Sequence, residues 1–278
     1  MVTQKQILLI QEKARIIRHH IVDMIGCEDG KVGHLGGSSS ASDIVSALYF
    51  YKMNIKSIKD PQRDWFLLSK GHAVLAQYAA LAEMGAFPVE ELTKVKCCGA
   101  ILQGHPDKNL TPGIEANTGS LGQGLSIALG IALGLSLDKI KSKVYVMMGD
   151  GEQSEGQIWE AAMAASYYRV DNLVGIIDRN RLQAMGKISE RFNSGDLIAK
   201  WSAFGWHTIE IDGHNVSQIC DSLDKADHIK EMPVIIIANT TKGKCITFAE
   251  DKAEFHNAGL TTEQYKRAHE DIDVYEAQ

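Results

Sequence analysis

Residues 143–180 read KVYVMMGDGEQSEGQIWEAAMAASYYRVDNLVGIIDRN and contain two apolar runs on either side of a helix-like segment. The runs 143–150 and 172–178 are almost entirely apolar, which is typical of strands that are buried on both faces. Residues 157–169 between them predict a helix. Strands of this kind that alternate with helices form a parallel sheet, because each parallel connection needs a crossover. The stretch therefore predicts an α/β fold with helices on both faces of a parallel sheet.

The same alternation extends in both directions along the chain. Three further strands are expected, at residues 64–69, 206–212 and 233–240. Helices are expected at residues 4–25, 44–53, 73–85, 125–137 and 215–230, with Ser42-Asp43 capping the start of the second. No shift in composition and no Pro/Gly-rich linker marks a boundary, so we expect a single domain over residues 1–278.

The composition of the chain argues against several classes of protein. Of its 278 residues 45% are hydrophobic and 23% are charged, and the net charge is −6, so no basic surface for nucleic acid is expected. No 18-residue apolar stretch free of charges is present, so we expect no membrane span. The five cysteines have no zinc spacing, and the N-terminus has no secretory pattern. We therefore expect a cytoplasmic protein with reduced thiols.

Two polar residues follow two of the predicted strands, and together they could bind a cation. Asp150 lies between two glycines directly after one strand, and Asn180 follows the next strand along the chain. Because ligands of a parallel sheet bind at the carboxyl ends of its strands, these side chains are expected to converge. Carboxylate and amide oxygens suit Mg²⁺, which also keeps phosphate and water oxygens as ligands. A Gly-Asp-Gly tripeptide alone is also typical of a tight turn, but Asn180 favours the cation site.

The spacing of these residues resembles the thiamine-diphosphate-binding motif. The motif residues here are Gly149-Asp150-Gly151, followed after 28 residues by Asn180. In that family the Asp, the Asn and a backbone carbonyl two residues after the Asn hold a divalent metal on the diphosphate of the cofactor. The resemblance therefore implies Mg²⁺ or Ca²⁺ bound by Asp150, Asn180 and the carbonyl of Leu182. The motif often has a second Asn where this chain has Arg181.

Four more segments resemble transketolases, and they occur in the transketolase order. They are residues 33–44, 67–85, 103–130 and 240–260. The resemblance spans nearly the whole chain and implies the thiamine-diphosphate-binding fold, here as a single diphosphate-binding domain. It also implies the reaction, which is the transfer of a two-carbon ketol unit from a ketose donor, such as a ketose phosphate, to an aldose acceptor.

The transketolase resemblance also implies roles for individual residues. His34, His105 and His256 are implied to be catalytic residues that bind the donor sugar, and Glu155 and Glu160 to relay protons toward a partner subunit. The residues implied to bind the cofactor are Ser40, Lys70, His72, Gly119, Ser120, Leu121, Gly149, Asp150, Gly151, Asn180, Lys242 and His256. The family often has glycine where this chain has Cys245. An ordinary surface or core role is expected for the remaining histidines, which are His19, His20, His207, His214, His228 and His269.

The resemblance covers only the N-terminal portion of a transketolase. In transketolases a glutamate of the pyrimidine-binding domain activates the cofactor from across a subunit interface, and this sequence has no second sheet domain before its end at Gln278. We therefore expect a split enzyme in which a second chain, a C-terminal transketolase subunit, supplies that domain. The expected assembly is an α2β2 heterotetramer. The residues that select the phosphorylated, sulfonated or branched end of the donor would then lie on the partner.

Four other readings of the sequence are less well supported. The α subunit of a 2-oxo-acid dehydrogenase shares Gly-Asp-Gly but lacks this set of histidines, and 1-deoxyxylulose-phosphate synthase is a longer single chain. A non-catalytic paralogue would not need Asp150, Asn180 and the histidines. Residues 119–124, GSLGQG, resemble a dinucleotide-binding loop, but they follow no apolar strand. Titration of the chain with the cofactor, alone and with its partner, would separate these readings.

Overall fold

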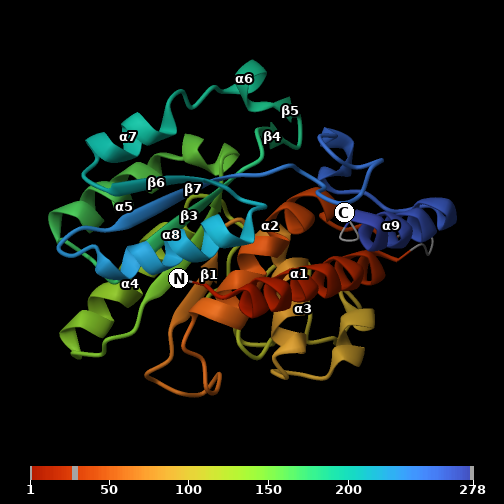
Figure 1. The fold of residues 1–278 in the computed structure, drawn as a ribbon, viewed down its shortest axis with the longest axis horizontal. Helices are drawn as coiled ribbons and strands as arrows, with labels where there is room; N and C mark the ends of the chain where they lie inside the picture. The colour runs from red at the N-terminus through yellow and green to blue at the C-terminus, as the bar shows by residue number, and fades with distance from the viewer. Residues whose placement is uncertain (1, 27–30, 276–278) are drawn as a thin grey trace.

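The computed structural model describes residues 2–26 and 31–275, and its centre is a five-stranded sheet in which all strands are parallel (Figure 1). The strands lie in the order β1 (Trp65–Leu68), β2 (Val144–Gly149), β3 (Leu173–Arg179), β7 (Val234–Asn239) and β6 (His207–Asp212). The last paired residues of β2 and β3 are Gly149 and Asp178, so these two strands end side by side. The predicted parallel sheet is therefore confirmed, with all five expected strands.

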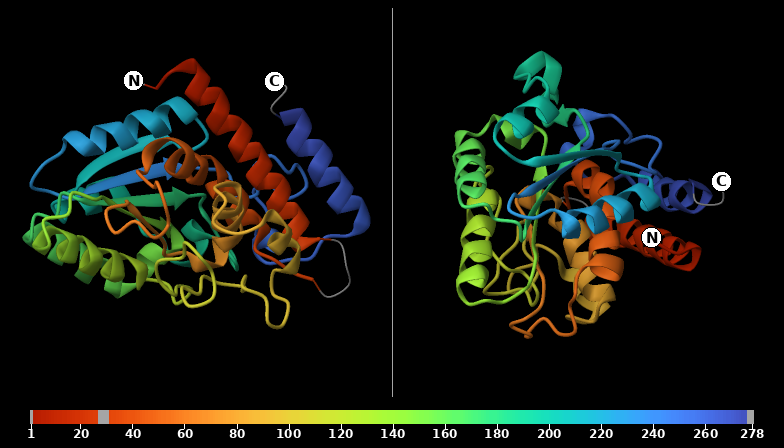
Figure 2. Two further views of the ribbon diagram at one scale, coloured as in Figure 1. Left: turned by 90° about the horizontal axis from the view of Figure 1, so that it is seen from below. Right: turned by 60° about the vertical axis from the view of Figure 1, so that its left-hand side comes forward.

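Helices cover both faces of this sheet, as Figure 2 shows. Alternate residues of a strand point to opposite faces, and β2 illustrates this. Val146 and Met148 pack on one face, where the helices are α4 (Gly124–Leu137), α5 (Gly156–Tyr167) and α7 (Leu197–Ala203). Tyr145 and Met147 pack on the other face, where the helices are α1 (Gln4–Ile25), α2 (Leu35–Ala47), α3 (Val74–Glu83) and α8 (Val216–His228). The sheet thus lies between two helical layers with a separate apolar core on each side.

Several smaller elements complete the fold. The C-terminal helix α9 (Thr262–Tyr275) lies along α1, and a short antiparallel hairpin follows β3. The remaining elements are β4 (Leu182–Gln183), β5 (Gly186–Lys187), α6 (Ile188–Arg191), the π turn Leu48–Lys52 and the 3-10 turns Gly71–Ala73, Val89–Lys94, Gly151–Ser154 and Ala253–His256. None of the helices in the described part of the chain combines the length and apolar character needed to cross a bilayer.

One predicted helix boundary is wrong. The helix expected from Ser42-Asp43 begins at Leu35, and every residue of α2 is buried. The glycines and serines at its start are small, so this part of the helix can lie close to its neighbours. A Cβ at Gly36 would lie 2.8 Å from Cγ of Lys242. Two serine hydroxyls donate to backbone carbonyls four residues earlier, so they need no outside partner. Ser42-Asp43 therefore lies inside the helix and does not cap it.

The turn after β7 contains a left-handed residue that is not glycine. Cys245 is buried and has φ = 71°, which lies in the left-handed region where glycine is favoured. Gly243, two residues earlier, has φ = 76°. The chain therefore keeps a turn of this shape with a non-glycine residue, at the end of the sheet where Lys242 is placed.

Candidate functional site

The carboxyl ends of β2 and β3 border a cavity of about 390 Å³, a size suited to a small-molecule ligand. Asp150 directly follows β2 and Asn180 directly follows β3, and both side chains are buried. Predicted site residues in the cavity lining are Lys70, His72, Gly119, Leu121, Gly149, Asp150, Gly151, Glu155, Asn180, Leu182, Lys242 and His256. The fold therefore gathers residues from widely separated segments of the chain around one cavity.

The other predicted site residues are absent from the lining of this cavity. Ser40 is fully buried in α2 and donates to Asp178 below the cavity floor. Ser120 is exposed, and Glu160 is exposed on α5. His34 and His105 are absent from the lining. His34 lies next to His72, which belongs to the lining, and His105 lies next to His34. The roles implied for these residues stay predictions.

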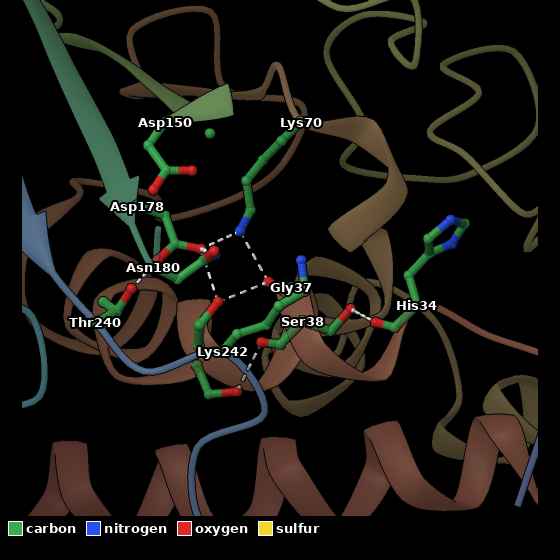
Figure 3. Close-up of polar contacts among 12 residues, drawn as sticks. His34, Gly37, Ser38, Lys70, Asp150, Asp178, Asn180, Thr240 and Lys242 are labelled. Atoms are coloured by element: carbon green, nitrogen blue, oxygen red, sulfur yellow. Dashed lines mark hydrogen bonds and ion pairs between the residues drawn. The ribbon is translucent and has the colours of Figure 1, made fainter. Parts of the chain in front are cut away.

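Oxygen atoms suited to a hard cation meet at the edge of the sheet (Figure 3). The carboxylate of Asp150 accepts the backbone N–H groups of Gly151 and Arg181. Burial raises the pKa of Asp150 to about 6, and the nearby charge of Asp178 adds to this effect. A bound cation would offset both effects. Asp150, the amide oxygen of Asn180 and the carbonyl of Leu182 therefore form a donor set that could hold Mg²⁺ or Ca²⁺.

The amide of Asn180 is oriented by its neighbours. Its Nδ2 donates to Oδ2 of Asp178 at 3.2 Å, and its Oδ1 accepts the backbone N–H of Leu182 at 3.1 Å. No group of three or more His, Cys, Asp or Glu side chains suited to a metal exists among the residues described. That result is compatible with this donor set, which contains a single carboxylate beside an amide and a backbone carbonyl.

Asp178, which is not among the site residues predicted from the sequence, anchors the floor of the site (Figure 3). It is fully buried at the end of β3 and accepts from Lys70 Nζ, Ser40 Oγ at 2.7 Å and Thr240 Oγ1. Burial would raise the pKa of Asp178, but Lys70 and these hydroxyl donors hold it below its usual value. Lys70 Nζ also donates to the carbonyl of Gly37 at 2.8 Å. Lys70 and Ser40 therefore support the cavity through Asp178.

Removal of one member of this buried pair is expected to destabilise the fold strongly. Lys70→Met leaves the Asp178 charge buried without its cation, which costs about 3–5 kcal/mol of unfolding free energy. The double variant Lys70→Met, Asp178→Asn should lose less free energy of unfolding than the sum of the losses in the two single variants. Urea denaturation measures these values, with Lys94→Met as the control, because the exposed Lys94–Glu91 pair is worth no more than about 1 kcal/mol. Additive losses in the double variant would contradict the coupling.

Glu152, also missed from the sequence, ties the glycine loop to the end of β2. Its buried carboxylate accepts from Ser69 Oγ, from the N–H of Gly122 at 2.8 Å and from the N–H of Gly149 at 3.0 Å. Burial raises the pKa of Glu152, and the three donors oppose this effect. The carboxylate therefore supplies the hydrogen-bond acceptor that water would otherwise give to these three groups. It also holds the loop 119–124 beside the cavity.

Four histidines from distant segments meet at one side of the cavity. Ring centroids are 4.9 Å apart for His72 and His256, 5.2 Å for His34 and His72, and 5.4 Å for His34 and His256. His105 joins the cluster through His34, at 5.9 Å. Gly119 packs against His105 in turn, since a Cβ there would lie 2.8 Å from its Cδ2. The fold thus brings together all four histidines that were predicted as site residues.

The imidazoles of this cluster are neutral at neutral pH. Burial lowers the pKa of His34 to about 4 and that of His256 to about 3, and nearby lysines add to both shifts. Burial also lowers the pKa of His72 and of His105, with Lys70 and Lys96 as the next causes. A neutral imidazole has one donor and one acceptor nitrogen, so it can bind hydroxyl groups in either sense. The cluster is therefore suited to a polyhydroxylated ligand.

These lowered pKa values predict that acid destabilises the chain through the cluster. Below pH of about 6.5 the unfolded histidines bind protons that the folded ones do not, so stability falls as pH decreases toward the folded pKa values. For each such proton the free energy of unfolding falls by about 1.4 kcal/mol per pH unit as the pH decreases. Urea denaturation between pH 7.5 and 5 should give a shallower slope for His34→Asn than for the natural sequence. An unchanged slope would contradict the assigned protonation state.

Lys242 gives the cavity a positive side. Its Nζ donates to the carbonyl of Leu182 at 3.0 Å and to Nδ1 of His256 at 3.0 Å. Burial lowers the pKa of Lys242 to about 8, and the charge of Lys70 contributes. Because Lys70 is already paired with Asp178, the buried ammonium of Lys242 is the charge that favours an anionic ligand in this cavity.

This fold and this site define a thiamine-diphosphate-dependent class of protein, and the comparison with known families gives its name. The family described as "Transketolase, thiamine diphosphate binding domain" matches residues 10–276. The chain therefore belongs to the transketolase family and corresponds to its thiamine-diphosphate-binding N-terminal half, as the sequence motifs indicated. Its enzymatic class is that of a transketolase-type transferase.

Two of the similar proteins are themselves subunits of about the same length. The "6-deoxy-6-sulfo-D-fructose transketolase subunit SqwG" of Clostridium sp. (strain MSTE9) is 43% identical over 261 residues, which are 93% of this chain and 94% of that protein. One of the apulose-4-phosphate transketolase subunits of Phocaeicola vulgatus is 43% identical over 240 residues, 86% of this chain and 85% of that protein. The solved transketolase from Campylobacter jejuni has a TM-score of 0.87 and 30% identity, and covers 98% of this chain but only 43% of its own. The chain thus spans less than half of a full-length transketolase.

Proposed function

We propose that this chain is the diphosphate-binding subunit of a two-chain transketolase, which transfers a two-carbon ketol unit from a ketose to an aldose. One observation carries the proposal. The cavity at the ends of β2 and β3 combines oxygen donors for a metal, two buried lysines and a neutral histidine cluster. These groups suit, in turn, a metal ion, a diphosphate and a sugar.

The metal and the diphosphate would occupy the side of the cavity at the strand ends. Asp150, Asn180 and the carbonyl of Leu182 would bind Mg²⁺ or Ca²⁺, and Lys242 would face the diphosphate. When bound, thiamine diphosphate supplies the carbanion stabilisation that transfer of a two-carbon unit requires. The chain itself would orient the cofactor, and the buried Lys242 would offset part of its charge, while Lys70 stays paired with Asp178.

The histidine cluster would bind the donor sugar. His34, His105 and His256 present neutral rings, and each can accept a hydrogen bond from a sugar hydroxyl or donate one to a sugar oxygen. Their lowered pKa values keep the acceptor nitrogens free of protons at neutral pH. We therefore assign these three side chains to the donor hydroxyl and carbonyl groups nearest the reacting carbon.

An apolar outer face on α4 and α5 supports the proposed partner subunit. Leu137 on α4 is 83% exposed and Tyr167 on α5 is 80% exposed, and Ile127 and Met163 are also exposed. Gly130 and Gly134 lie on the same outer face of α4, where nothing lies within 4 Å of the position that a Cβ would take. Exposed apolar faces of this kind mark protein interfaces. Glu160 lies on the α5 side of this face, where a proton relay toward a partner would have to run.

The proposed function is tested by reconstitution with a C-terminal transketolase-like chain. The chain alone should bind thiamine diphosphate weakly and show no ketol transfer, whereas the mixture should be active and should sediment as an α2β2 assembly. A donor panel of phosphorylated, sulfonated and branched ketoses identifies the substrate. The names of the two similar subunits make 6-deoxy-6-sulfo-D-fructose and apulose 4-phosphate the first donors to include. Full activity of the isolated chain would refute the two-chain proposal.

The partner interface gives a separate prediction. Met163→Glu together with Tyr167→Glu should prevent assembly, because two charges would be placed in an apolar contact. Analytical ultracentrifugation should then find the two chains apart, while circular dichroism finds the chain folded. The matched control is Val274→Glu on α9, which also replaces an exposed apolar side chain. Normal assembly of the α5 double variant would exclude this face as the interface.

A further inference from the structure

His214 has a half-buried position that its sequence context did not predict. It follows the edge strand β6, and its side chain is only 14% exposed. Its Nε2 accepts the backbone N–H of Thr241 at 2.8 Å, and its Nδ1 lies 2.7 Å from Oδ2 of Asp43. Because Nε2 is an acceptor, the ring proton must be on Nδ1 and is donated to Asp43. A single neutral tautomer therefore links helix α2 to the loop that follows β7.

The acceptor of this proton is itself held firmly. Oδ2 of Asp43 also accepts from Arg18 of α1 at 2.6 Å, and both side chains are buried. Burial alone would raise the pKa of Asp43, but Arg18 and His214 lower it to about 2. Asp43 is therefore a charged acceptor at neutral pH, fixed between α1 and α2. An anchored carboxylate of this kind sets both the tautomer and the orientation of an imidazole.

The loop that His214 holds contains Lys242 of the candidate site. On one side of Thr241, the hydroxyl of Thr240 donates to Asp178. On the other side, Lys242 Nζ reaches the carbonyl of Leu182, and the N–H of Gly243 donates to the carbonyl of Gly36 at 3.0 Å. The hydrogen bond from Thr241 to His214 is therefore flanked along the chain by Thr240, which contacts Asp178 in the floor of the cavity, and by Lys242, which lies in its wall.

We infer that His214 is a positioning residue for the site: anchored by Asp43, it fixes the backbone of Thr241 and thereby the place of Lys242 in the cavity. The inference rests on the proposed function in one respect, because Lys242 is there assigned to the diphosphate of the cofactor. His214 itself is not among the residues that line the cavity. It acts through the backbone of the loop.

Two substitutions separate the two hydrogen bonds of His214. The amide nitrogen of asparagine can replace Nδ1 toward Asp43, but asparagine is too short to accept from Thr241. Glutamine can place its amide oxygen where Nε2 accepts from Thr241. His214→Asn should therefore free the loop, and His214→Gln should largely restore it. The matched control is His228→Asn, since His228 is exposed at the end of the adjacent helix α8.

The experiment measures three quantities on the chain assembled with its partner. Hydrogen exchange of the Thr241 amide reports its hydrogen bond to His214, and the labelling rate of the Lys242 amine reports how accessible that side chain is. Calorimetry gives the affinity for thiamine diphosphate in the presence of Mg²⁺. His214→Asn should speed exchange and labelling and weaken the cofactor by about three- to tenfold, the size expected for one net hydrogen bond. Turnover at saturating cofactor should change little, and exchange in the core of β7 should stay slow in every variant.

The outcomes distinguish the inference from the proposed function. Unchanged exchange at Thr241 in His214→Asn, or faster exchange without any change in Lys242 labelling, would overturn the positioning role. Equal effects of His214→Asn and His214→Gln would overturn it as well, because the acceptor at Thr241 would then be irrelevant. If the natural sequence binds no thiamine diphosphate, the proposed function fails, while the exchange and labelling rates still decide whether His214 positions Lys242.

Discussion

Asp150→Ala is expected to abolish metal-dependent binding of thiamine diphosphate and to leave the chain folded. Of the three proposed metal ligands only Asp150 carries a charge, so its loss removes the main attraction for a divalent cation. The cost to the fold is modest, because the N–H groups of Gly151 and Arg181 lose one acceptor in an open cavity. Each of these two N–H groups would cost about 1–3 kcal/mol if no water in the cavity replaced its acceptor.

Calorimetric titration with thiamine diphosphate in Mg²⁺ or Ca²⁺ measures the effect of Asp150→Ala, and circular dichroism monitors the fold. Asp138→Ala is the control, because Asp138 is exposed at the end of α4, away from the strand ends. Cofactor affinity equal to that of the natural sequence would remove Asp150 from the metal site. Loss of the fold itself would show instead that its hydrogen bonds to the loop after β3 are essential.

His105→Ala is expected to lower turnover by roughly 10²–10⁴-fold, the usual contribution of an acid–base group, with little change in cofactor affinity. The ring lies at the outer end of the histidine cluster and is absent from the lining of the cavity in which the diphosphate is proposed to bind. Its backbone is held separately, since Tyr78 donates to the His105 carbonyl at 3.1 Å. The change should therefore act on the sugar step alone.

The measurement for His105→Ala is turnover of the reconstituted enzyme at saturating cofactor, together with the calorimetric affinity for thiamine diphosphate. His228→Ala serves as the control on an exposed histidine. A variant that keeps near-normal turnover on every donor of the panel would show that His105 does not contact the reacting end of the sugar.

The sheet was predictable because its strands are apolar over their whole length and alternate with helices. The adjacency of Asp150 and Asn180 followed from that pattern alone, since consecutive parallel strands were expected to be neighbours. The start of α2 was not predictable in the same way. Glycine and serine favour turns in an exposed chain, but here a Cβ at Gly36 would crowd Lys242, so the helix needs glycine at that position.

The residues that the sequence reading missed have partners that are distant in the chain. Asp178 reads as the last residue of an apolar strand, and its cation Lys70 precedes it by 108 residues. His214 is separated from Asp43 by 171 residues, so no local spacing distinguishes it from a surface histidine. Contacts of this range arise from the fold, which places several strand ends at one edge. Short elements such as the hairpin after β3 and α7 were missed because they carry too few residues for a periodic pattern.

The apolar outer face of α4 and α5 has a consequence for how a cell would have to make this protein. A chain that leaves Leu137 and Tyr167 in water is at risk of self-association until another surface covers them. Synthesis of the two proposed chains in matched amounts, from neighbouring genes or on one transcript, would keep the unassembled pool small. An excess of this chain would be expected to burden chaperones and proteases, so its abundance would follow that of its partner.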